Sequence, residues 1–294
     1  MKNFILIGVS GYVAKKHLSA INKSKNNLIA AYDINENLQL LKSYFPKCKF
    51  YNKLNTLQKF IRNSKKKIHY LSICSPNHLH LKHIKFGIDN NLNVICEKPI
   101  VLNNIQFKKL EKISIEKDRK ISSILQLRNH PSLIKLKNKI KNSQKIHKVD
   151  LIYYTERDEN YFKTWKGNTK KSGGIMLNIG IHFFDILIWI FGDVLEQKIF
   201  NLNNCQASGS LILKKAKIKW NLSVKSKKIK KMNNLKVYRS IKVDGKEIKF
   251  SKTFDDLHLL NYKSILRSKK SNFDESFKSI KLINNLKKNY NAVQ

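Results

Sequence analysis

The chain has little arginine and few acidic residues, yet its formal net charge is +39. Only six of its 59 basic residues are arginine. Specific recognition of phosphates and bases favours the guanidinium fork of arginine. The lysines are spread along the whole chain among many Asn and Ile residues, and all three amino acids have AT-rich codons, so a biased genome explains the charge. We therefore expect a solvated lysine surface and no nucleic-acid partner, with a charge that still attracts anionic substrates.

Cysteine and long apolar runs are also scarce. The four cysteines lack the paired spacing of a metal site, and two of them lie in apolar strand-like runs, as buried thiols often do. A reducing cytoplasm is the expected compartment, with no bound metal. The longest apolar run, around 179–191, is too short to cross a bilayer. The N-terminus enters a short apolar run without a cleavage site, which predicts a first strand instead of a signal peptide, and no membrane partner.

The length of 294 residues and the hydrophobic content of 41 % suit two globular domains. Short apolar runs alternate with helical patterns in the first part, which is typical of βαβ units and a parallel sheet. Strands are predicted at 4–7, 27–32, 68–74, 93–96 and 120–126. Helices are predicted at 12–23, 35–44, 56–63, 78–90, 104–117 and 131–141.

The pattern changes after about residue 145, where sequential strands with short turns indicate a largely antiparallel sheet. These strands are predicted at 147–155, 195–201, 208–213, 216–224, 235–243 and 246–250. Helices are predicted within 172–191 and at 256–266 and 274–288. We therefore divide the chain into an α/β dinucleotide-binding (Rossmann) domain over residues 1–128 and an α+β domain over residues 129–294.

A glycine-containing turn, Gly8-Val9-Ser10-Gly11-Tyr12-Val13-Ala14, follows the first predicted strand. Glycines there allow the backbone to approach a pyrophosphate at the start of a helix. The G-x-x-G-x-x-A spacing also fits an ordinary strand–helix turn. Asp33, at the end of the second strand, can bind both hydroxyls of an adenosine ribose and repels a 2′-phosphate, although it could instead cap a helix. The turn and Asp33 together favour NAD as the cofactor.

Two further motifs follow predicted parallel strands, whose carboxyl ends bind ligands in such sheets. Ser75-Pro76-Asn77-His78 could also be a proline turn with a helix cap. In Glu97-Lys98-Pro99, Lys98 could be one more surface lysine, but its place after an apolar strand favours a position in the ligand crevice.

The stretch 172–185 begins with Gly173-Gly174 and continues into an apolar helix. Asn178 and His182 are four residues apart and share one helix face, with Asp185 close to it. An isolated histidine on such a helix is more often a satisfied core residue. Three polar groups on one face require partners, and a substrate is a suitable one.

These motifs resemble, in order, those of the Gfo/Idh/MocA oxidoreductase family, and the resemblance covers essentially the whole chain. It implies a Rossmann domain followed by a domain with a large, open, mainly antiparallel sheet. It also implies an NAD-dependent sugar dehydrogenase that assembles into a homodimer or homotetramer through that sheet.

Within the family the chain is most similar to UDP-N-acetylglucosaminuronate 3-dehydrogenases of surface-polysaccharide (lipopolysaccharide) synthesis. The likeness lies in the segments 11–17, 72–77, 96–103, 126–131, 165–167, 172–174, 178–185 and 256–262. The wider family often has Asp where this chain has Asn178, and the 3-dehydrogenases share the asparagine. Because an amide cannot accept a proton, His182 would carry the base role with less electrostatic help.

The resemblance implies a nucleotide-sugar substrate and the following residue roles. The catalytic residues would be Lys98 and His182. The substrate-binding residues would be Asn178, Arg157, Tyr161, Lys166 and Asp185. The cofactor-binding residues would be Gly8, Ser10, Gly11, Tyr12, Val13, Asp33, Ser75, Pro76, Asn77, His80, Glu97, Lys98, Gln126 and Trp165.

Two other interpretations remain open. The chain could oxidise another sugar or an inositol within the same family. It could also be a non-catalytic Rossmann protein that binds NAD or nucleic acid, although a sensor has no need of the Lys98 and His182 pair.

Overall fold

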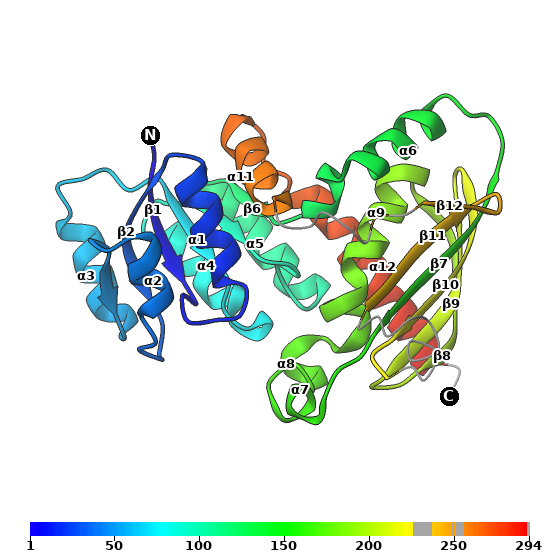
Figure 1. The fold of residues 1–294 in the computed structure, drawn as a ribbon, viewed down its shortest axis with the longest axis horizontal. Coiled ribbons are helices and arrows are strands. Elements are labelled where there is room, and N and C mark those ends of the chain that lie inside the picture. Colours follow the sequence, from blue (N-terminus) through cyan, green and yellow to red (C-terminus); the bar gives the residue numbers. More distant parts are fainter. Residues whose placement is uncertain (226–236, 249, 251–255, 293–294) are drawn as a thin grey trace. The chain divides into compact units, whose positions relative to one another are not determined.

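The computed structural model describes residues 1–225, 237–248, 250 and 256–292 (Figure 1). The chain forms two compact units. The first consists of Met1–Gln126 and Asp255–Glu275, and the second of Leu127–Phe254 and Ser276–Gln294. The sequence analysis placed the division at residue 128 and assigned all later residues to the second domain, so the segment Asp255–Glu275 differs from that expectation.

The first unit contains a six-stranded parallel sheet in the order β3-β2-β1-β4-β5-β6. Its strands are β1 (Asn3–Ile7), β2 (Asn27–Tyr32), β3 (Lys49–Tyr51), β4 (Tyr70–Ile73), β5 (Asn93–Cys96) and β6 (Ile121–Ser123). Its helices are α1 (Ala14–Lys23), α2 (Gln39–Tyr44), α3 (Leu54–Asn63), η1 (Asn77–Leu79), α4 (His80–Asp89), α5 (Asn104–Glu116) and α11 (Leu257–Arg267). The order reverses between β1 and β4, which is the point where doubly wound sheets bind ligands.

Propensity and pattern predicted most of this unit. The bounds of β2 and β5 are those predicted, because both are short apolar runs with a polar residue at each side. The strand β3 was missed, since its three residues carry no alternating pattern of their own. The helix predicted at 35–44 is confined to Gln39–Tyr44, because the residues before it form the loop around Asp33.

The segment Asp255–Glu275 joins the first unit through apolar packing. Tyr262 and Ile265 of α11 lie in the same buried cluster as Phe4, Leu18 and Ile21. Phe273, at the start of α12 (Phe273–Asn291), stacks on Phe107 with 4.0 Å between the ring centroids. The pattern along the chain predicts that α11 is a helix, but it carries no information on which sheet the helix packs against.

The second unit contains a six-stranded mixed sheet in the order β12-β11-β7-β10-β9-β8. Its strands are β7 (His147–Thr155), β8 (Val194–Leu202), β9 (Gln206–Leu213), β10 (Ala216–Ser223), β11 (Val237–Val243) and β12 (Lys246–Ile248). Only the β7–β10 pair is parallel among these ladders. The predicted strand residues 235, 236 and 249 lie outside the described residues. The mainly antiparallel sheet is thus confirmed.

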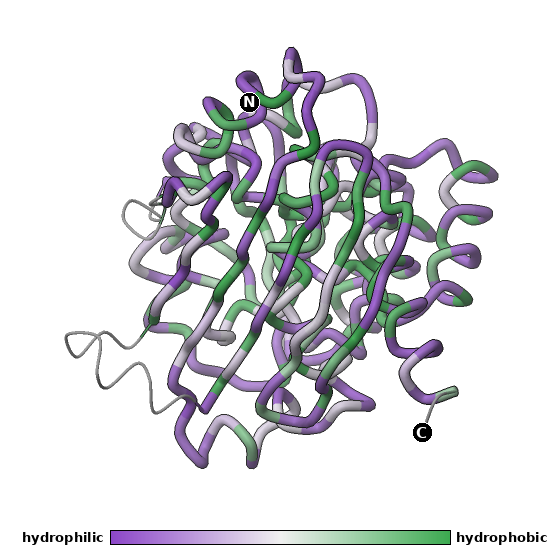
Figure 2. The backbone as a smooth tube through the Cα atoms, turned by 90° about the vertical axis from the view of Figure 1, so that its right-hand side faces the viewer, coloured by the Kyte–Doolittle hydropathy of each residue, from purple (hydrophilic) through white to green (hydrophobic). Residues whose placement is uncertain are grey.

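One face of this second sheet packs against helices. The helices of the unit are η2 (Gln126–Asn129), α6 (Pro131–Lys141), α7 (Glu159–Lys163), α8 (Thr169–Ser172), η3 (Met176–Gly180), α9 (Ile181–Phe191) and most of α12. Phe184 of α9 meets Trp220 of β10 edge to face, and a Cβ atom added to Gly180 would lie 2.6 Å from Leu222. Figure 2 looks onto the opposite face, which no helix of the described ranges covers and where hydrophilic and hydrophobic residues alternate along the strands.

The residues Thr169–Phe191 are long and apolar enough to span a bilayer by length and composition, which the sequence analysis did not expect. The most apolar window of this stretch is 78 % buried inside the structure. The stretch is interrupted after α8 by Gly173 and Gly174, whose φ angles are +83° and +74°. Burial to this degree is what a core helix of a globular unit shows.

Candidate active site

The glycine turn brings the end of β1 against the end of β4. Gly8 has a φ of +89°, and an added Cβ atom would lie 2.6 Å from the backbone N of Ser75 and 2.7 Å from the carbonyl carbon of Cys74. The N–H of Gly11 donates to the carbonyl of Gly8 at 3.1 Å, which closes the turn before α1. Only glycine fits the first position, because both the backbone angle and the close approach exclude a side chain.

Asp33 organises the loop between β2 and α2. Its Oδ2 accepts the N–H of Ser10 at 2.9 Å, and its Oδ1 accepts the N–H of Asn35 at 3.1 Å. The hydroxyl of Ser10 donates to the carbonyl of Asn35 at 2.8 Å. Each carboxylate oxygen has further acceptor capacity, so a fixed and half-buried Asp33 can still accept hydroxyl groups of a ribose.

The start of α1 has the properties of an anion site. Val13 is its N-cap residue and provides no side-chain hydrogen bond, and no acidic residue lies in the first turn. Tyr12, directly before it, is 89 % exposed. The positive end of a ten-residue helix without a side-chain cap suits a pyrophosphate. The residues of this turn therefore fit a dinucleotide.

Ser75, Pro76 and Asn77 lie after β4, next to the glycine turn, and a pair of buried histidines supports them. The Oγ of Ser75 lies 2.8 Å from Nδ1 of His83. His80 bridges two loops, because its Nε2 lies 2.8 Å from the carbonyl oxygen of Ser75 and its Nδ1 lies 2.7 Å from that of Pro99. His80 was predicted to bind the cofactor, which stays a prediction, and in the structure its ring is fully buried against two backbone carbonyls.

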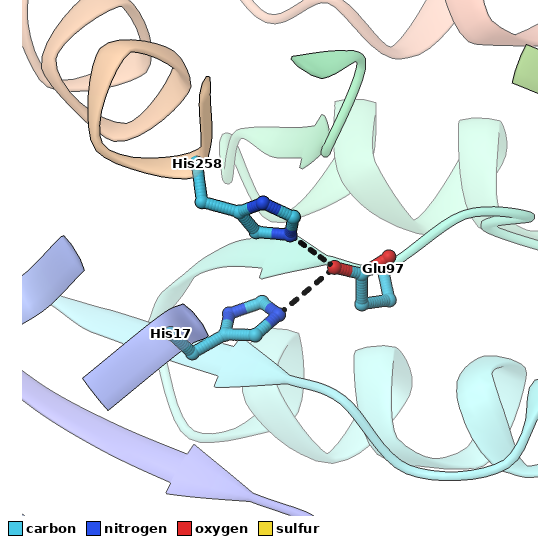
Figure 3. A group of neighbouring side chains, drawn as sticks. All are labelled: His17, Glu97 and His258. Carbon is cyan, nitrogen blue, oxygen red and sulfur yellow. Dashed lines mark hydrogen bonds and ion pairs between the residues drawn. The ribbon is translucent and has the colours of Figure 1, made fainter. Parts of the chain in front are cut away.

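Lys98 follows β5 and is half-buried, at the same edge of the sheet as Gly8 and Ser75. The side chain of Glu97, the residue before Lys98, is buried and points towards His17 and His258 (Figure 3). Oε1 of Glu97 lies 3.0 Å from Nε2 of His17 and 3.0 Å from Nε2 of His258. Glu97 was also predicted to bind the cofactor, which stays a prediction, and in the structure its Oε1 lies against two histidines. Gln126 begins η2 at the end of this unit.

Four of the residues predicted to bind substrate form a polar cluster in the second unit. Nδ2 of Asn178 donates to the hydroxyl of Tyr161 at 2.8 Å. The guanidinium carbon of Arg157 lies 5.4 Å from the centroid of the Tyr161 ring, and Nζ of Lys166 lies 6.0 Å from it. Burial, and then the charge of Arg157, lower the pKa of Lys166 below its usual value. Two cations placed against one tyrosine ring are suited to an anionic ligand.

Trp165, predicted to contact the cofactor, lies between Tyr161 and Lys166 in sequence and is half-buried in the second unit. Asn178 lies in the π-helical turn η3, and His182 lies in the first turn of α9 with a half-buried side chain. π-helical turns inside helices are frequent at functional sites. The spacing of four residues keeps Asn178 and His182 near one face of the helix.

Asp185, the remaining residue predicted to bind substrate, has a structural partner. Its two oxygens accept Nε of Arg128 at 2.9 Å and Nη2 at 2.7 Å, and its side chain is 3 % exposed. The bidentate ion pair joins η2 to α9. Its carboxylate is thus engaged in holding the helix that carries His182.

Sequence reasoning missed several residues of these constellations, namely His17, His83, Arg128, His258 and Tyr262. A signal was present for His17, Arg128, His258 and Tyr262, because they lie in the segments 11–17, 126–131 and 256–262 that carry the resemblance. Their contacts are not readable from spacing, since His17 and Tyr262 are 245 residues apart.

Comparison with known proteins agrees with this description. Residues 2–124 match the Gfo/Idh/MocA model for an oxidoreductase family with an NAD-binding Rossmann fold, and residues 137–203 match the model for its C-terminal alpha/beta domain. Glucose-6-phosphate 3-dehydrogenase from Bacillus subtilis (strain 168) is 27 % identical over 204 residues, which are 65 % of this chain and 54 % of that protein. The matched part thus spans about half of the length of this relative.

Solved structures are similar over nearly the full chain. The WlbA (WbpB) dehydrogenase from Thermus thermophilus, in complex with NAD and UDP-GlcNAcA, is 35 % identical with a TM-score of 0.90, covering 96 % of this chain and 94 % of that chain. The same dehydrogenase is known in complex with NAD and alpha-ketoglutarate. The WlbA dehydrogenase from Bordetella pertussis is 19 % identical with a TM-score of 0.82, covering 98 % of this chain and 94 % of that chain, which shows the fold alone.

We predict that Asp185→Asn destabilises the protein strongly. Arg128 would keep its charge in a site where its side chain is only 15 % exposed, and breaking a buried pair from one side costs about 3–5 kcal/mol. Urea unfolding measures the loss. The double variant Arg128→Met with Asp185→Leu removes both charges and is expected to lose less than Asp185→Asn. Equal stability of Asp185→Asn and wild type would contradict the structural role.

We also predict a pH dependence that originates at His83. Burial, followed by the nearby cationic groups, lowers the pKa of His83 to about 4, whereas the unfolded chain binds this proton near pH 6.5. The free energy of unfolding is therefore highest above about pH 6.5. It falls as the pH drops towards 4, because the unfolded chain binds a proton that His83 in the folded protein does not bind. Between pH 7 and pH 5 this one group accounts for about 2 kcal/mol of lost stability.

The test compares urea unfolding of the wild type and His83→Gln at both pH values. The amide of glutamine can still bond Ser75 but does not titrate, so the variant should lose about 2 kcal/mol less than the wild type on acidification. Parallel losses in the two proteins would show that His83 does not remain neutral in the folded state.

Proposed function

Because the chain belongs to the Gfo/Idh/MocA oxidoreductase family, we propose that it oxidises the 3-hydroxyl group of UDP-2-acetamido-2-deoxyglucuronate (UDP-GlcNAcA) with NAD. The product is the 3-keto sugar, a precursor for surface polysaccharide such as O-antigen. The cluster of Arg157, Tyr161, Lys166 and Asn178 carries the proposal, because it offers an anion two cations beside the helix of His182. The likeness to a dehydrogenase crystallised with NAD and UDP-GlcNAcA supports this substrate.

The first unit would hold the cofactor, and NAD accepts a hydride when it is bound. The glycine turn and the N-terminus of α1 would bind the pyrophosphate through backbone N–H groups. Asp33 would accept the hydroxyls of the adenosine ribose and exclude a 2′-phosphate by charge repulsion. Ser75, Pro76 and Asn77 lie at the same edge of the sheet, where they would line the remaining part of the site.

His182 and Lys98 would carry the proton chemistry. Imidazole is the side chain that most often acts as a general base at neutral pH, so His182 would remove the proton of the sugar 3-hydroxyl. Lys98 would donate a hydrogen bond to the same oxygen and stabilise its developing negative charge. Asn178 would orient the sugar through its amide, which cannot accept the proton itself.

Arg157 and Lys166 would bind the uronate carboxylate or the pyrophosphate of the substrate, with Tyr161 between them. Charge-assisted hydrogen bonds from fixed cations contribute about 1.5–3 kcal/mol each. A sugar phosphate offers the same type of anion, so glucose 6-phosphate is a second candidate, supported by the Bacillus subtilis relative. A free inositol or another uncharged sugar would leave these cations without a ligand.

The direct test mixes the purified protein with NAD and UDP-GlcNAcA and follows the NADH absorbance, with mass spectrometry of the sugar. We expect a sugar product two mass units lighter. A parallel reaction contains alpha-ketoglutarate, because NADH that is reoxidised in place produces no absorbance but still leaves the oxidised sugar and a 2-hydroxy acid. Turnover of glucose 6-phosphate but not of UDP-GlcNAcA would identify the sugar phosphate as the substrate. Turnover of neither sugar would refute the proposed substrate.

We predict that Lys98→Ala and His182→Asn each reduce kcat by at least about 100-fold, because general acid–base groups contribute about 10²–10⁴-fold. Unfolding curves should stay close to those of the wild type, since both side chains are only half-buried. Lys163→Ala, an exposed lysine of α7, is the matched control and should retain full turnover. Near-normal turnover in both site variants would contradict the assigned roles.

A further inference from the structure

A chain of buried polar side chains runs through the first unit and ends at the residue before Lys98. The Oγ of Ser72 and Nδ1 of His17 both lie 2.7 Å from the hydroxyl oxygen of Tyr262. His17 in turn lies 3.0 Å from Oε1 of Glu97, and His258 contacts the same oxygen (Figure 3). None of these five side chains exceeds 10 % exposure. We call this group the Glu97 network.

Hydrogen bonding and burial together set the charges of Glu97 and His258. Burial alone would raise the pKa of Glu97, but the hydrogen bonds from His17 and His258 hold it well below the usual range, so the group is a carboxylate. Burial lowers the pKa of His258, which makes its imidazole neutral with the N–H on Nε2. Its Nδ1 is buried and has no hydrogen-bond partner among the described residues, as expected for a ring nitrogen that carries no proton.

The network is coupled to the backbone of Lys98. Oε2 of Glu97 accepts the N–H of Lys98 at 3.3 Å, and the N–H of Glu97 donates to the carbonyl of Ile73 in β4 at 2.9 Å. On the other side of Lys98, His80 lies 2.7 Å from the carbonyl oxygen of Pro99. Buried histidines thus hold both neighbours of Lys98 in the chain: His17 and His258 contact Glu97, and His80 contacts Pro99.

Two members of the network come from the last part of the chain. His258 and Tyr262 belong to α11, one turn apart, and the ring of Tyr262 is fully buried beside Phe4. The segment Asp255–Glu275 therefore supplies more than apolar cover to the first unit. It completes the hydrogen bonding of a carboxylate that belongs to the Lys98 motif.

We infer that His17, His258 and Tyr262 are positioning residues for Lys98, which act by locking the Glu97 carboxylate and through it the loop that presents the lysine. The inference rests on the proposed function, in which Lys98 bonds the reacting oxygen. The Glu97 carboxylate accepts N–H groups of His17, His258 and Lys98, which fix its orientation. Loss of one of these histidines would let the loop that carries Lys98 move. Displacement of a catalytic group by about 1 Å costs on the order of 100-fold in rate.

The same side chains could in principle ligate a divalent metal, because Nε2 of both histidines and a Glu97 oxygen lie within 4.8 Å of one another. The observed contacts favour hydrogen bonding. Both imidazoles approach the same oxygen at 3.0 Å, and the only other ring nitrogen with a partner is Nδ1 of His17. Ligating histidines generally bond a second group through the other nitrogen, and Nδ1 of His258 has no such partner among the described residues.

The test measures kcat, the KM for NAD and the KM for sugar in the full-length enzyme, with the variants His258→Gln, Glu97→Gln and Tyr262→Phe. We expect kcat to fall about 10- to 100-fold in the first two variants and less in Tyr262→Phe, with the KM for NAD within about twofold. With deuterium at the reacting carbon of the sugar, the isotope effect on kcat should rise in His258→Gln, because the chemical step becomes slower.

Phe273→Leu is the matched control, since it weakens the docking of the same segment at Phe107 without touching the network. It should lose stability but keep kcat and the isotope effect per folded enzyme. A loss of kcat in Phe273→Leu as large as in His258→Gln would show that the network only anchors the segment Asp255–Glu275, and it would overturn the inference.

Two further outcomes would also overturn it. One is a stoichiometric metal in the purified enzyme that disappears in His258→Gln. The other is full kcat in His258→Gln and Glu97→Gln while Lys98→Ala is inactive, which leaves the proposed function intact. Normal turnover in Lys98→Ala would instead refute the proposed function itself.

Discussion

The arrangement of the loops in the first unit depends on the close approach of the Gly8 backbone to the residues that follow β4. The absence of a side chain at Gly8 lets the turn after β1 lie against Cys74 and Ser75, where a Cβ atom would stand within 2.9 Å of three backbone atoms. The close approach sets the glycine turn and the Ser75 loop side by side at the carboxyl edge of the sheet. Asp33 joins the same edge through Ser10. The start of α1 has no side-chain cap, and the N–H groups of Ala14 and Lys16 donate to the carbonyls of Gly11 and Val13 within the turn.

The second unit depends on a different kind of interaction, the burial of charge. The ion pair between Arg128 and Asp185 connects η2 to α9. Both oxygens of Asp185 accept N–H groups of Arg128, and these two hydrogen bonds offset the free-energy cost of burying the charges. Elsewhere in the unit, Arg157 and Lys166 share one tyrosine ring. The carboxylate of Asp185 is thus committed to structure, and the anion-binding role proposed above falls to Arg157 and Lys166.

The sequence predicts the order of most elements, the family and the NAD-binding motifs, because local periodicity and short motifs encode them. Four residues chosen as substrate ligands, Arg157, Tyr161, Lys166 and Asn178, indeed lie together. The sequence does not predict the partners of Asp185 or Glu97. Both are long-range pairs, and a carboxylate next to a motif gives no sign of whether it faces a ligand or the core. The place of α11 escaped for the same reason, since amphipathic periodicity shows that a helix packs but not against which sheet.

Transfer of the hydrogen from carbon 3 of the sugar tests the account most directly. UDP-GlcNAcA carrying deuterium at carbon 3 is incubated with the protein and NAD, and the recovered cofactor is analysed by mass spectrometry. The account predicts NADH that is heavier by one mass unit, and unlabelled NADH when the deuterium is placed at carbon 4. Label from carbon 4, or NADH without label from either substrate, would contradict oxidation of the 3-hydroxyl group.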